Sequence, residues 1–320
     1  MNASKKKESP YIKGFFTTIV FGIFSLFMLI QHTEIIAEDS RLCACDRCVM
    51  DLKDDYWFFK RFNPTIQTMM NKNNRVLNED VDSWWNSLQP YSSTQTYADL
   101  VDILFDLFPD EDHFVETSLD RCRTCAVVGN SGNLLKSHYG KLIDSHDFVL
   151  RINMGPTKGY EQDVGSKTTH RIIYPESAVD LDNLTHLVLV PFKTLDLHWL
   201  ISAFTTKHIK NTYKRVRGTI DADIDRVMIV HPAFMKYVYD NWSEGRGRYP
   251  STGFLTVILA LHICDKVDVF GFGAKSNGRW HHYFDKTLIH FSKGMHSGNF
   301  ENVTIHKLLL RNKIFMYKGL

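Results

Sequence analysis

Short apolar runs, separated by polar or helical stretches, follow one another in the last two thirds of the chain. Seven runs have the length of buried strands: residues 125–129, 147–153, 169–175, 186–192, 226–232, 266–273 and 312–317. Most are apolar throughout rather than alternating, which is typical of parallel strands covered by helices on both faces. The pattern predicts an α/β fold with a doubly wound, mainly parallel, Rossmann-like sheet. Ligands are expected beyond the carboxyl ends of its strands.

Helical spacing is strongest in two other parts of the chain. Residues 252–262, rich in Leu, Val and Ala, are expected to form a crossover helix packed on the sheet. The apolar spacing of residues 56–108 predicts a group of helices added before the sheet, at the N-terminal side of the domain. Its first apolar face would contain Trp57, Phe58, Phe62, Ile66, Met69 and Met70. Further amphipathic helices are expected over 84–89 and 97–109, with Pro109 ending the last.

Residues 14–30 form an uncharged apolar run near the N-terminus. Lysines precede the run, and acidic residues follow from Glu34. At about 1.5 Å per residue it spans roughly 25 Å, the short limit for crossing a bilayer. The positive-inside rule then predicts a cytoplasmic tail (1–13), a transmembrane anchor (14–30), a stem (31–55) and a lumenal domain (56–320). A cleaved signal peptide is the alternative.

Cysteine usage agrees with an oxidising compartment under either reading. The six cysteines stand at 43, 45, 48, 122, 125 and 264, and an even number favours three disulfides among fifteen possible pairings. A zinc site is the alternative, because C-x-C-x-x-C and C-x-x-C spacings suit thiolate ligands. Glycosylation sequons at Asn183, Asn241 and Asn302 support a lumenal location.

Composition and charge narrow the class of partner. With 44% hydrophobic and 13% aromatic residues the chain can bury a large core, which excludes a disordered protein. A net charge of +2, without clustered basic residues, argues against nucleic acid as a partner.

The stretch CAVVGNSGNL, residues 125–134, carries a strand directly into a turn rich in glycine and asparagine. The turn departs from both the dinucleotide fingerprint G-x-G-x-x-G and the Walker loop. By itself it is as consistent with a structural turn as with a ligand site. A dinucleotide oxidoreductase is disfavoured because no second glycine pair or acidic ribose partner follows at the expected offset.

Four ordered stretches together resemble the sialyl motifs of the animal sialyltransferases. Residues 125–177, from CAVVG to YPES, resemble the large motif, and residues 231–273, from HPAF to FGFG, resemble the small motif. HHYF at 281–284 is similar to motif III, and HSGNFE at 296–301 is similar to the very small motif. Within the family, CACDRC, WWNSLQ and RYPSTG resemble the β-galactoside α-2,3-sialyltransferases that act on Gal-β-1,3-GalNAc of O-glycans.

The resemblance implies a sialyltransferase variant of the GT-A fold and an inverting transfer from CMP-sialic acid. His296 would be the base that takes the acceptor proton, because an imidazole, with an ordinary pKa of about 6.5, suits that task. His282 would assist departure of CMP at its phosphate, and Glu301 would orient its neighbours. The remaining donor-binding positions implied are Asn130, Ser131, Asn153, Tyr174, Tyr213, Ser251, Thr252, Gly253, Gly273 and His281.

Acceptor contacts and disulfides follow from the same resemblance. The implied acceptor residues are Gln89, Ser177 and Tyr249, whereas Trp84 and Trp85 are expected in the core. The implied disulfides are Cys43–Cys48, Cys45–Cys122 and Cys125–Cys264. Two departures from the family pattern concern donor affinity: Phe284 replaces the usual tryptophan of motif III, and the loop 285–295, with Lys286, Lys293 and Gly294, is short.

No metal cofactor is expected, because hydroxyls, amides and an imidazolium can meet the charge of a departing monophosphate. Three D-x-D triplets, at 80–82, 180–182 and 221–223, resemble the metal-binding element of other nucleotide-sugar transferases. They lie outside the motifs and are expected to be caps and solvated turns.

The resulting hypothesis is a single-pass type II Golgi membrane enzyme that adds sialic acid to the 3-hydroxyl of galactose. Its partners would be CMP-sialic acid, galactose-terminated O-glycans of glycoproteins, and the membrane through residues 14–30. Glycolipids remain open as a second acceptor class. The alternative is a catalytically silent, membrane-tethered glycan-binding protein on the same fold.

Overall fold

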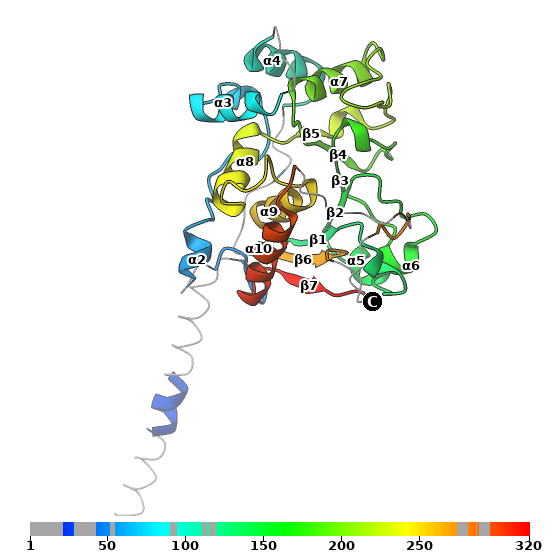
Figure 1. Ribbon diagram of the computed structural model, residues 1–320. Helices are drawn as coiled ribbons and strands as arrows, with labels where there is room; N and C mark the ends of the chain where they lie inside the picture. The colour runs from blue at the N-terminus through cyan, green and yellow to red at the C-terminus, as the bar shows by residue number, and fades with distance from the viewer. Residues whose placement is uncertain are drawn as a thin grey trace, which may run out of the picture.

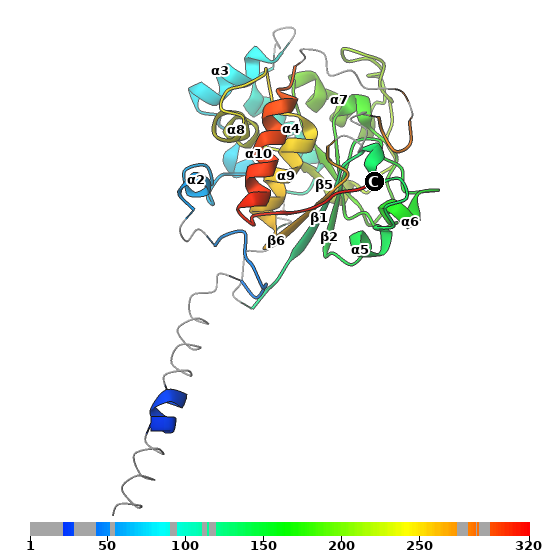
Figure 2. The ribbon, with the colours of Figure 1, turned by 60° about the horizontal axis from the view of Figure 1, so that its bottom comes forward.

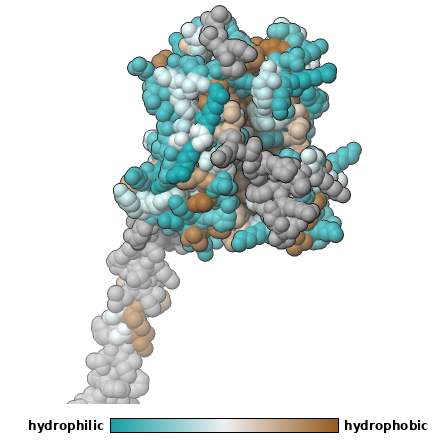
Figure 3. Space-filling view, in the orientation of Figure 1, coloured by the Kyte–Doolittle hydropathy of each residue, from teal (hydrophilic) through white to brown (hydrophobic). Residues whose placement is uncertain are grey.

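The computed structural model describes residues 22–28, 43–51, 55–89, 95–110, 114, 120–273, 281–285, 287 and 295–320. Residues 22–28 are helical, and their apolar side chains are uncovered, as Figure 3 shows. Within the described residues no helix is both long and apolar enough to cross a bilayer. The remainder of the predicted anchor lies outside these residues, so the anchor stays a prediction.

Seven parallel strands form one sheet in the order β5-β4-β3-β2-β1-β6-β7 (Figure 1). Their bounds are β1 Thr124–Val128, β2 Phe148–Ile152, β3 His170–Ile173, β4 His186–Leu189, β5 Val227–Ile229, β6 Lys266–Phe270 and β7 Phe315–Tyr317. Six strands fall within their apolar runs, and β1 begins one residue before its run, so the predicted strands and their parallel arrangement are confirmed.

The strand order creates a switch point beside the first strand. In β1, Val127 lies opposite Leu150 of β2 on one side and Val269 of β6 on the other. From β1 the chain adds strands outward to β5, and then returns to place β6 and β7 on the opposite side of β1. The loops after β1 and β6 therefore lie beside each other at the carboxyl edge of the sheet, where α/β sheets bind ligands.

Helices cover both faces of the sheet (Figures 1 and 2). The crossover helix α9, Thr252–Ile263, is apolar on nearly all sides and packs against β1, β2, β3 and β6. The helices α8, Pro232–Tyr237, and α10, Gly298–Leu310, lie on the same side as α9, and the short α5, Gly140–Asp144, and α6, Glu161–Val164, lie on the other. The predicted crossover helix is thus confirmed.

A second helical group covers the β5 end of the sheet. It contains α3, Glu79–Ser87, α4, Tyr97–Leu107, and α7, Thr194–Phe204. Trp85 of α3 is buried, and its indole N–H donates to the carbonyl oxygen of Pro191 at 2.8 Å. The core interpretation of this tryptophan is therefore right.

The prediction that residues from Trp57 to Met70 form one apolar helix face is wrong. Helix α2 covers only Tyr56–Phe59. Pro64 disfavours a helical conformation in the residue before it, and the chain beyond runs to Met69, which forms an antiparallel bridge with Val230. Phe58 and Phe62 are buried in the main core, so the apolar spacing here reflects separate core contacts rather than one helix face.

The remaining short elements are one-turn helices. These are η1 Lys72–Asn74, η2 Gly132–Leu134, η3 Pro175–Ser177, η4 Ile224–Arg226 and the π-helical η5 Val238–Trp242.

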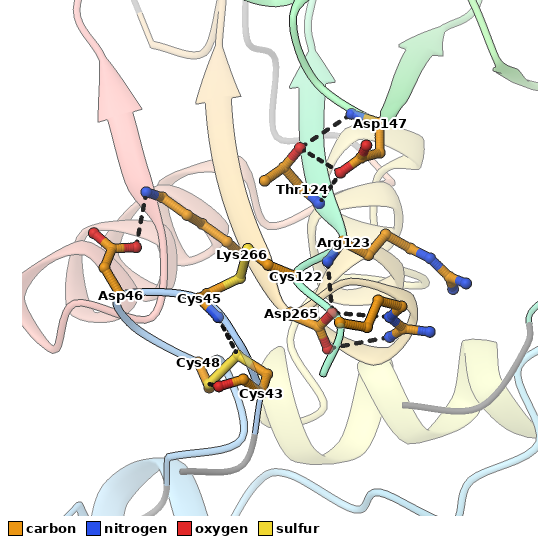
Figure 4. The surroundings of a disulfide bond; sticks show 11 residues. Cys43, Cys45, Asp46, Cys48, Cys122, Arg123, Thr124, Asp147, Asp265 and Lys266 are labelled. Carbon is orange, nitrogen blue, oxygen red and sulfur yellow. Dashed lines mark hydrogen bonds and ion pairs between the residues drawn. A yellow bond between two sulfur atoms is a disulfide. The ribbon is translucent and has the colours of Figure 1, made fainter. Parts of the chain in front are cut away.

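Three disulfides join the chain at Cys43–Cys48, Cys45–Cys122 and Cys125–Cys264, the pairings implied by the resemblance. Figure 4 shows the Cys45–Cys122 bond where the first cysteine segment meets the start of β1. Val49 of this segment is buried in the main core, and its N–H donates to the Asp265 carbonyl oxygen at 2.8 Å. Part of the segment predicted as stem is therefore packed on the domain.

Candidate active site

The turns that follow β1 and β6 are hydrogen-bonded together at the switch point. The Gly129 N–H donates to the Phe270 carbonyl oxygen at 2.8 Å, and the Ser131 N–H donates to that of Gly271 at 3.0 Å. The Ser131 hydroxyl donates to the Gly273 carbonyl oxygen at 2.7 Å. The glycine-rich turn is therefore held directly against the end of the small-motif region.

The segment 281–285 closes over this turn. The Gly132 N–H donates to the His281 carbonyl oxygen at 2.7 Å, and the Tyr283 N–H donates to that of Asn130 at 3.0 Å. A Cβ atom at position 132 would overlap the imidazole of His281, so only glycine fits. Two regions separated by about 150 positions are thereby locked in contact.

His282 lies half-buried beside Ser131, with which it forms an isolated bridge. Its ring stacks on Phe284 at a centroid distance of 5.0 Å. Burial lowers the pKa of His282, and the opposing effect of Asp285 is smaller. The neutral ring is favoured in the free protein, so a phosphate would meet an N–H donor rather than a fixed positive charge.

A cavity of about 500 Å³ lies beside these turns. Eight predicted site residues line it: Asn153, Tyr174, Tyr213, Tyr249, Ser251, Thr252, Gly253 and His296. They come from loops after β2, β3, α7 and η5, from the first turn of α9, and from the segment before α10. The fold brings most of the predicted donor residues to one cavity.

Contacts at Ile152 join this cavity to the glycine turn. The Asn130 side-chain amide donates to the Ile152 carbonyl oxygen at 2.9 Å, directly before Asn153, whose φ is +55°. Gly253 faces both Ile152 and Phe272. The glycine turn and the cavity are therefore adjoining parts of one site.

His296 stands at the rim of the cavity with its ring orientation fixed. Its Nδ1 lies 3.1 Å from the Tyr249 carbonyl oxygen, and the two rings meet edge to face at 4.9 Å. A carbonyl oxygen only accepts, so Nδ1 carries the hydrogen in this contact. In the neutral ring the lone pair then lies on Nε2, which leaves this nitrogen able to accept a proton.

Glu301, in the first turn of α10, contacts the first turn of α9. Its carboxylate accepts from the N–H of Ser251 at 2.8 Å and from its hydroxyl at 2.6 Å. Burial raises the pKa of Glu301, while the bonds from Ser251 and the charge of His296 act in the opposite direction. The predicted orienting role of this carboxylate thus has a geometric basis.

Three phenols give the cavity neutral hydrogen-bond donors. Burial is the first cause that raises the pKa of Tyr174, Tyr213 and Tyr249, and nearby Glu176 adds to it in each case. These hydroxyls therefore keep their protons near neutral pH. Protonated phenols can donate to anionic oxygens, as the phosphate interpretation of Tyr174 and Tyr213 requires.

The predicted acceptor residues Gln89 and Ser177 lie behind the cavity wall. The Gln89 side-chain oxygen accepts from the Thr194 N–H at 2.5 Å, and its amide donates to the Trp85 carbonyl oxygen at 3.0 Å. The Ser177 hydroxyl donates to the Tyr174 carbonyl oxygen at 3.0 Å. In this structure both side chains support the wall, whereas Tyr249 lines it directly.

A buried charge cluster at the cavity was missed by the sequence analysis. The Lys193 ammonium lies 2.6 Å from Asp196 and 3.3 Å from Glu176. Lys193 and Glu176 line the cavity, and burial raises the pKa of Asp196 to about 7. One signal was available: Glu176 and Lys193 each follow an apolar run, β3 and β4, at its carboxyl end.

The D-x-D triplets lie elsewhere and have ordinary partners. Asp80 pairs with Lys236 at 2.9 Å, Asp180 pairs with Arg217 at 2.5 Å, and Asp223 caps η4. Within the described residues no group of three potential ligands is placed to hold a metal ion. The cap interpretation fits Asp223, whereas the first triplet lies inside α3, whose cap is Asn78, so the cap and turn interpretation is wrong for residues 80–82.

The predicted glycosylation sites do not line the described cavity, and the predicted closing loop is described only in part. Asn183 and Asn302 are exposed and Asn241 is half-buried, and their glycosylation stays a prediction. Lys286, Lys293 and Gly294 of the predicted closing loop lie outside the described residues.

The fold is an α/β sheet with a cavity beside its switch point and the imidazole of His296 at the cavity rim. The model of glycosyltransferase family 29 (sialyltransferase) matches residues 69–313. The chain therefore belongs to this family of sialyltransferases.

Known relatives are similar over most of their length. The Sus scrofa protein named CMP-N-acetylneuraminate-beta-galactosamide-alpha-2,3-sialyltransferase 1 is 49% identical over 283 residues, 87% of this chain and 82% of that protein. The Homo sapiens protein of that name is 47% identical over 283 residues, 87% and 83% of the two chains. A solved mammalian sialyltransferase in complex with Gal-beta-1-3GalNAc-ortho-nitrophenol has a TM-score of 0.82 at 48% identity, covering 87% of this chain and all of that one.

Proposed function

We propose that this sialyltransferase moves sialic acid from CMP-sialic acid to the 3-hydroxyl of a terminal galactose, with Gal-β-1,3-GalNAc of O-glycans as its preferred acceptor. The observation that carries the proposal is the Nδ1 contact of His296 with the Tyr249 carbonyl oxygen, which leaves Nε2 as a base at the cavity rim. The names of the relatives support the linkage.

The reaction is one displacement with inversion. The acceptor 3-hydroxyl gives its proton to His296 Nε2 as its oxygen bonds to the anomeric carbon of sialic acid. The bond from that carbon to the phosphate oxygen breaks, and CMP leaves with the electron pair. Hydroxyls of Tyr174 and Tyr213 and the N–H of His282 would donate to the phosphate as its charge grows.

Neutral groups would hold the rest of the donor. The turn around Asn130 and Ser131 would bind the nucleotide through backbone amides and side-chain amide groups. Thr252 and Gly253 lie in the first turn of α9, where backbone N–H groups favour an anionic ligand, and the Ser251 hydroxyl lies at its cap. We propose that no metal ion takes part.

We further propose a type II topology in the Golgi membrane, with residues 1–13 in the cytosol, residues 14–30 in the bilayer and the catalytic domain in the lumen. Three disulfides suit an oxidising compartment.

The proposal is tested with the full-length protein in detergent, CMP-sialic acid and Gal-β-1,3-GalNAc. Released CMP is measured, and the product linkage is assigned by NMR. His296→Ala should lower kcat by about 100- to 10,000-fold. The control is His306→Ala, an exposed histidine of α10, which should retain turnover.

Two outcomes would change the conclusion. Acceptor binding without CMP release above the His296→Ala level would favour the silent glycan-binding protein. Loss of activity in chelator, with recovery on adding manganese, would contradict the metal-independent mechanism. Parallel assays with a galactose-terminated glycolipid separate the two acceptor classes.

A further inference from the structure

Tyr213 stands at the tip of a tight turn whose base is well anchored. Asn211 and Arg215 form an isolated antiparallel bridge, and the Thr212 N–H donates to the Lys214 carbonyl oxygen at 2.8 Å. The Tyr213 residue itself is 59% exposed. Packing therefore covers less than half of this residue, and contacts with neighbouring polar and charged groups contribute to holding its phenol in place.

Contacts from a buried charge cluster reach this tip. The Thr212 hydroxyl donates to Oε1 of Glu176. The Lys193 ammonium lies 4.9 Å from the centroid of the Tyr213 ring, within range of a cation–π interaction. Lys193 in turn pairs with Glu176 and Asp196.

The cluster is rigid because its charges are buried. Side-chain exposure is 8% for Lys193, 6% for Glu176 and 0% for Asp196. Moving one of these groups would leave another charged group buried without its partner, which is costly. The Asp196 carboxylate also accepts from the N–H groups of Phe192 and Lys193, so the cluster is tied to the start of α7.

Glu176 lies close in the chain to Tyr174 and contacts the turn that carries Tyr213, so it can fix the positions of both phenols without itself binding a phosphate. It follows Tyr174 by two residues on η3, and it holds the turn of Tyr213 through Thr212. A carboxylate would repel a phosphate, so its contribution to an anionic ligand has to pass through the groups it positions.

We propose that Glu176, through the hydroxyl of Thr212, and Lys193, through the ring of Tyr213, are positioning residues that hold the Tyr213 phenol at the phosphate of the bound nucleotide. This inference rests on the proposed donor and its phosphate contact with Tyr213. It assigns the residues 176, 193 and 212 a role in recognising the phosphate and none in recognising the base or ribose.

The test compares binding of CMP and cytidine to the full-length protein by calorimetry. Thr212→Val removes the hydroxyl at nearly unchanged volume. It should weaken CMP binding by about 10- to 150-fold, the range for losing a hydrogen bond to a charged group. Cytidine affinity should change by less than about twofold, and Thr212→Ser should restore CMP affinity. The control is Thr219→Val, at an exposed threonine, which should bind both ligands normally.

A double-mutant cycle then asks whether Thr212 acts through Tyr213. Tyr213→Phe should also weaken CMP selectively, and the double variant should be no weaker than Tyr213→Phe alone. The inference would be overturned if Thr212→Val bound CMP as tightly as wild type, or if it lost affinity for CMP and cytidine equally. It would also be overturned if the double variant lost CMP affinity by the product of the two single effects. The proposed function would stand in each case. Failure of the wild-type protein to bind CMP would overturn the proposed function, and the inference with it.

Discussion

The carboxylate of Glu301 accepts both the backbone N–H and the hydroxyl of Ser251, which joins the first turn of α10 to the first turn of α9. The Ser251 hydroxyl also accepts from the Phe254 N–H as the cap of α9. Because the candidate base His296 comes just before α10, this one carboxylate sets the donor-side helix and the base in fixed relation. The very small motif thus supplies His296 and also, through Glu301, joins the first turns of α9 and α10.

Replacing Glu301 by Gln should weaken that bridge. An amide can accept only one of the two bonds from Ser251, so one buried donor loses its partner, at a cost of about 1–3 kcal/mol in the free energy of unfolding. We also expect a higher KM for CMP-sialic acid. Urea unfolding and initial-rate kinetics measure both effects. Glu79→Gln, on the exposed start of α3, is the control, and equal behaviour of the two variants would contradict the prediction.

Gly132→Ala should disrupt the contact between the glycine turn and the 281–285 segment. The added methyl group overlaps the His281 ring, and overpacking of this kind costs about 1–3 kcal/mol of stability. Thermal unfolding measures the loss. Adding His281→Ala removes the ring and should recover most of the lost stability, so a double variant as unstable as Gly132→Ala would count against a steric cause.

The disulfide Cys125–Cys264 should contribute more stability than Cys43–Cys48. The first joins residues 139 positions apart and the second residues only 5 apart. In the loop-entropy model, replacing both cysteines by Ala costs about 5 kcal/mol for the long loop and about 2 kcal/mol for the short one. Chemical denaturation of the two double variants tests this order, and a larger loss for Cys43–Cys48 would refute it.

Stability should fall in mild acid through His231. This buried ring caps α8: its Nδ1 accepts from the Ala233 N–H at 2.9 Å, and its Nε2 lies 3.0 Å from the Asn74 carbonyl oxygen. The neutral tautomer satisfies both contacts, and burial lowers the pKa of His231 below its ordinary value of 6.5. The folded state therefore favours the neutral ring. Its contribution to stability is complete above pH 6.5 and is lost as pH falls through the lowered pKa.

The measurement is the unfolding free energy of wild type and His231→Asn between pH 7.5 and 5. Asn can cap the helix but does not titrate in this range. The variant should lose less stability than wild type on acidification. Identical pH slopes would show that His231 does not contribute to the acid sensitivity.

The chain's local pattern was sufficient to predict all seven strands, the crossover helix α9 and the position of the glycine turn. Buried parallel strands are continuous apolar runs, and a turn at their carboxyl ends needs residues such as Gly129 and Gly132. The resemblance to the sialyl motifs then located His296 and Tyr249, which the cavity brings together.

Local pattern was misleading where distant partners decide the conformation. Met69 has helical spacing with its neighbours, but its backbone pairs with Val230, and Pro64 ends the helical possibility. No periodicity could show that Glu176 and Thr212, 36 positions apart, share a hydrogen bond, or that Lys193 lies over Tyr213. Apolar periodicity records which side of an element is buried. The partners of a buried charge depend instead on how loops from different strands converge, and that convergence is set only when the whole sheet is packed.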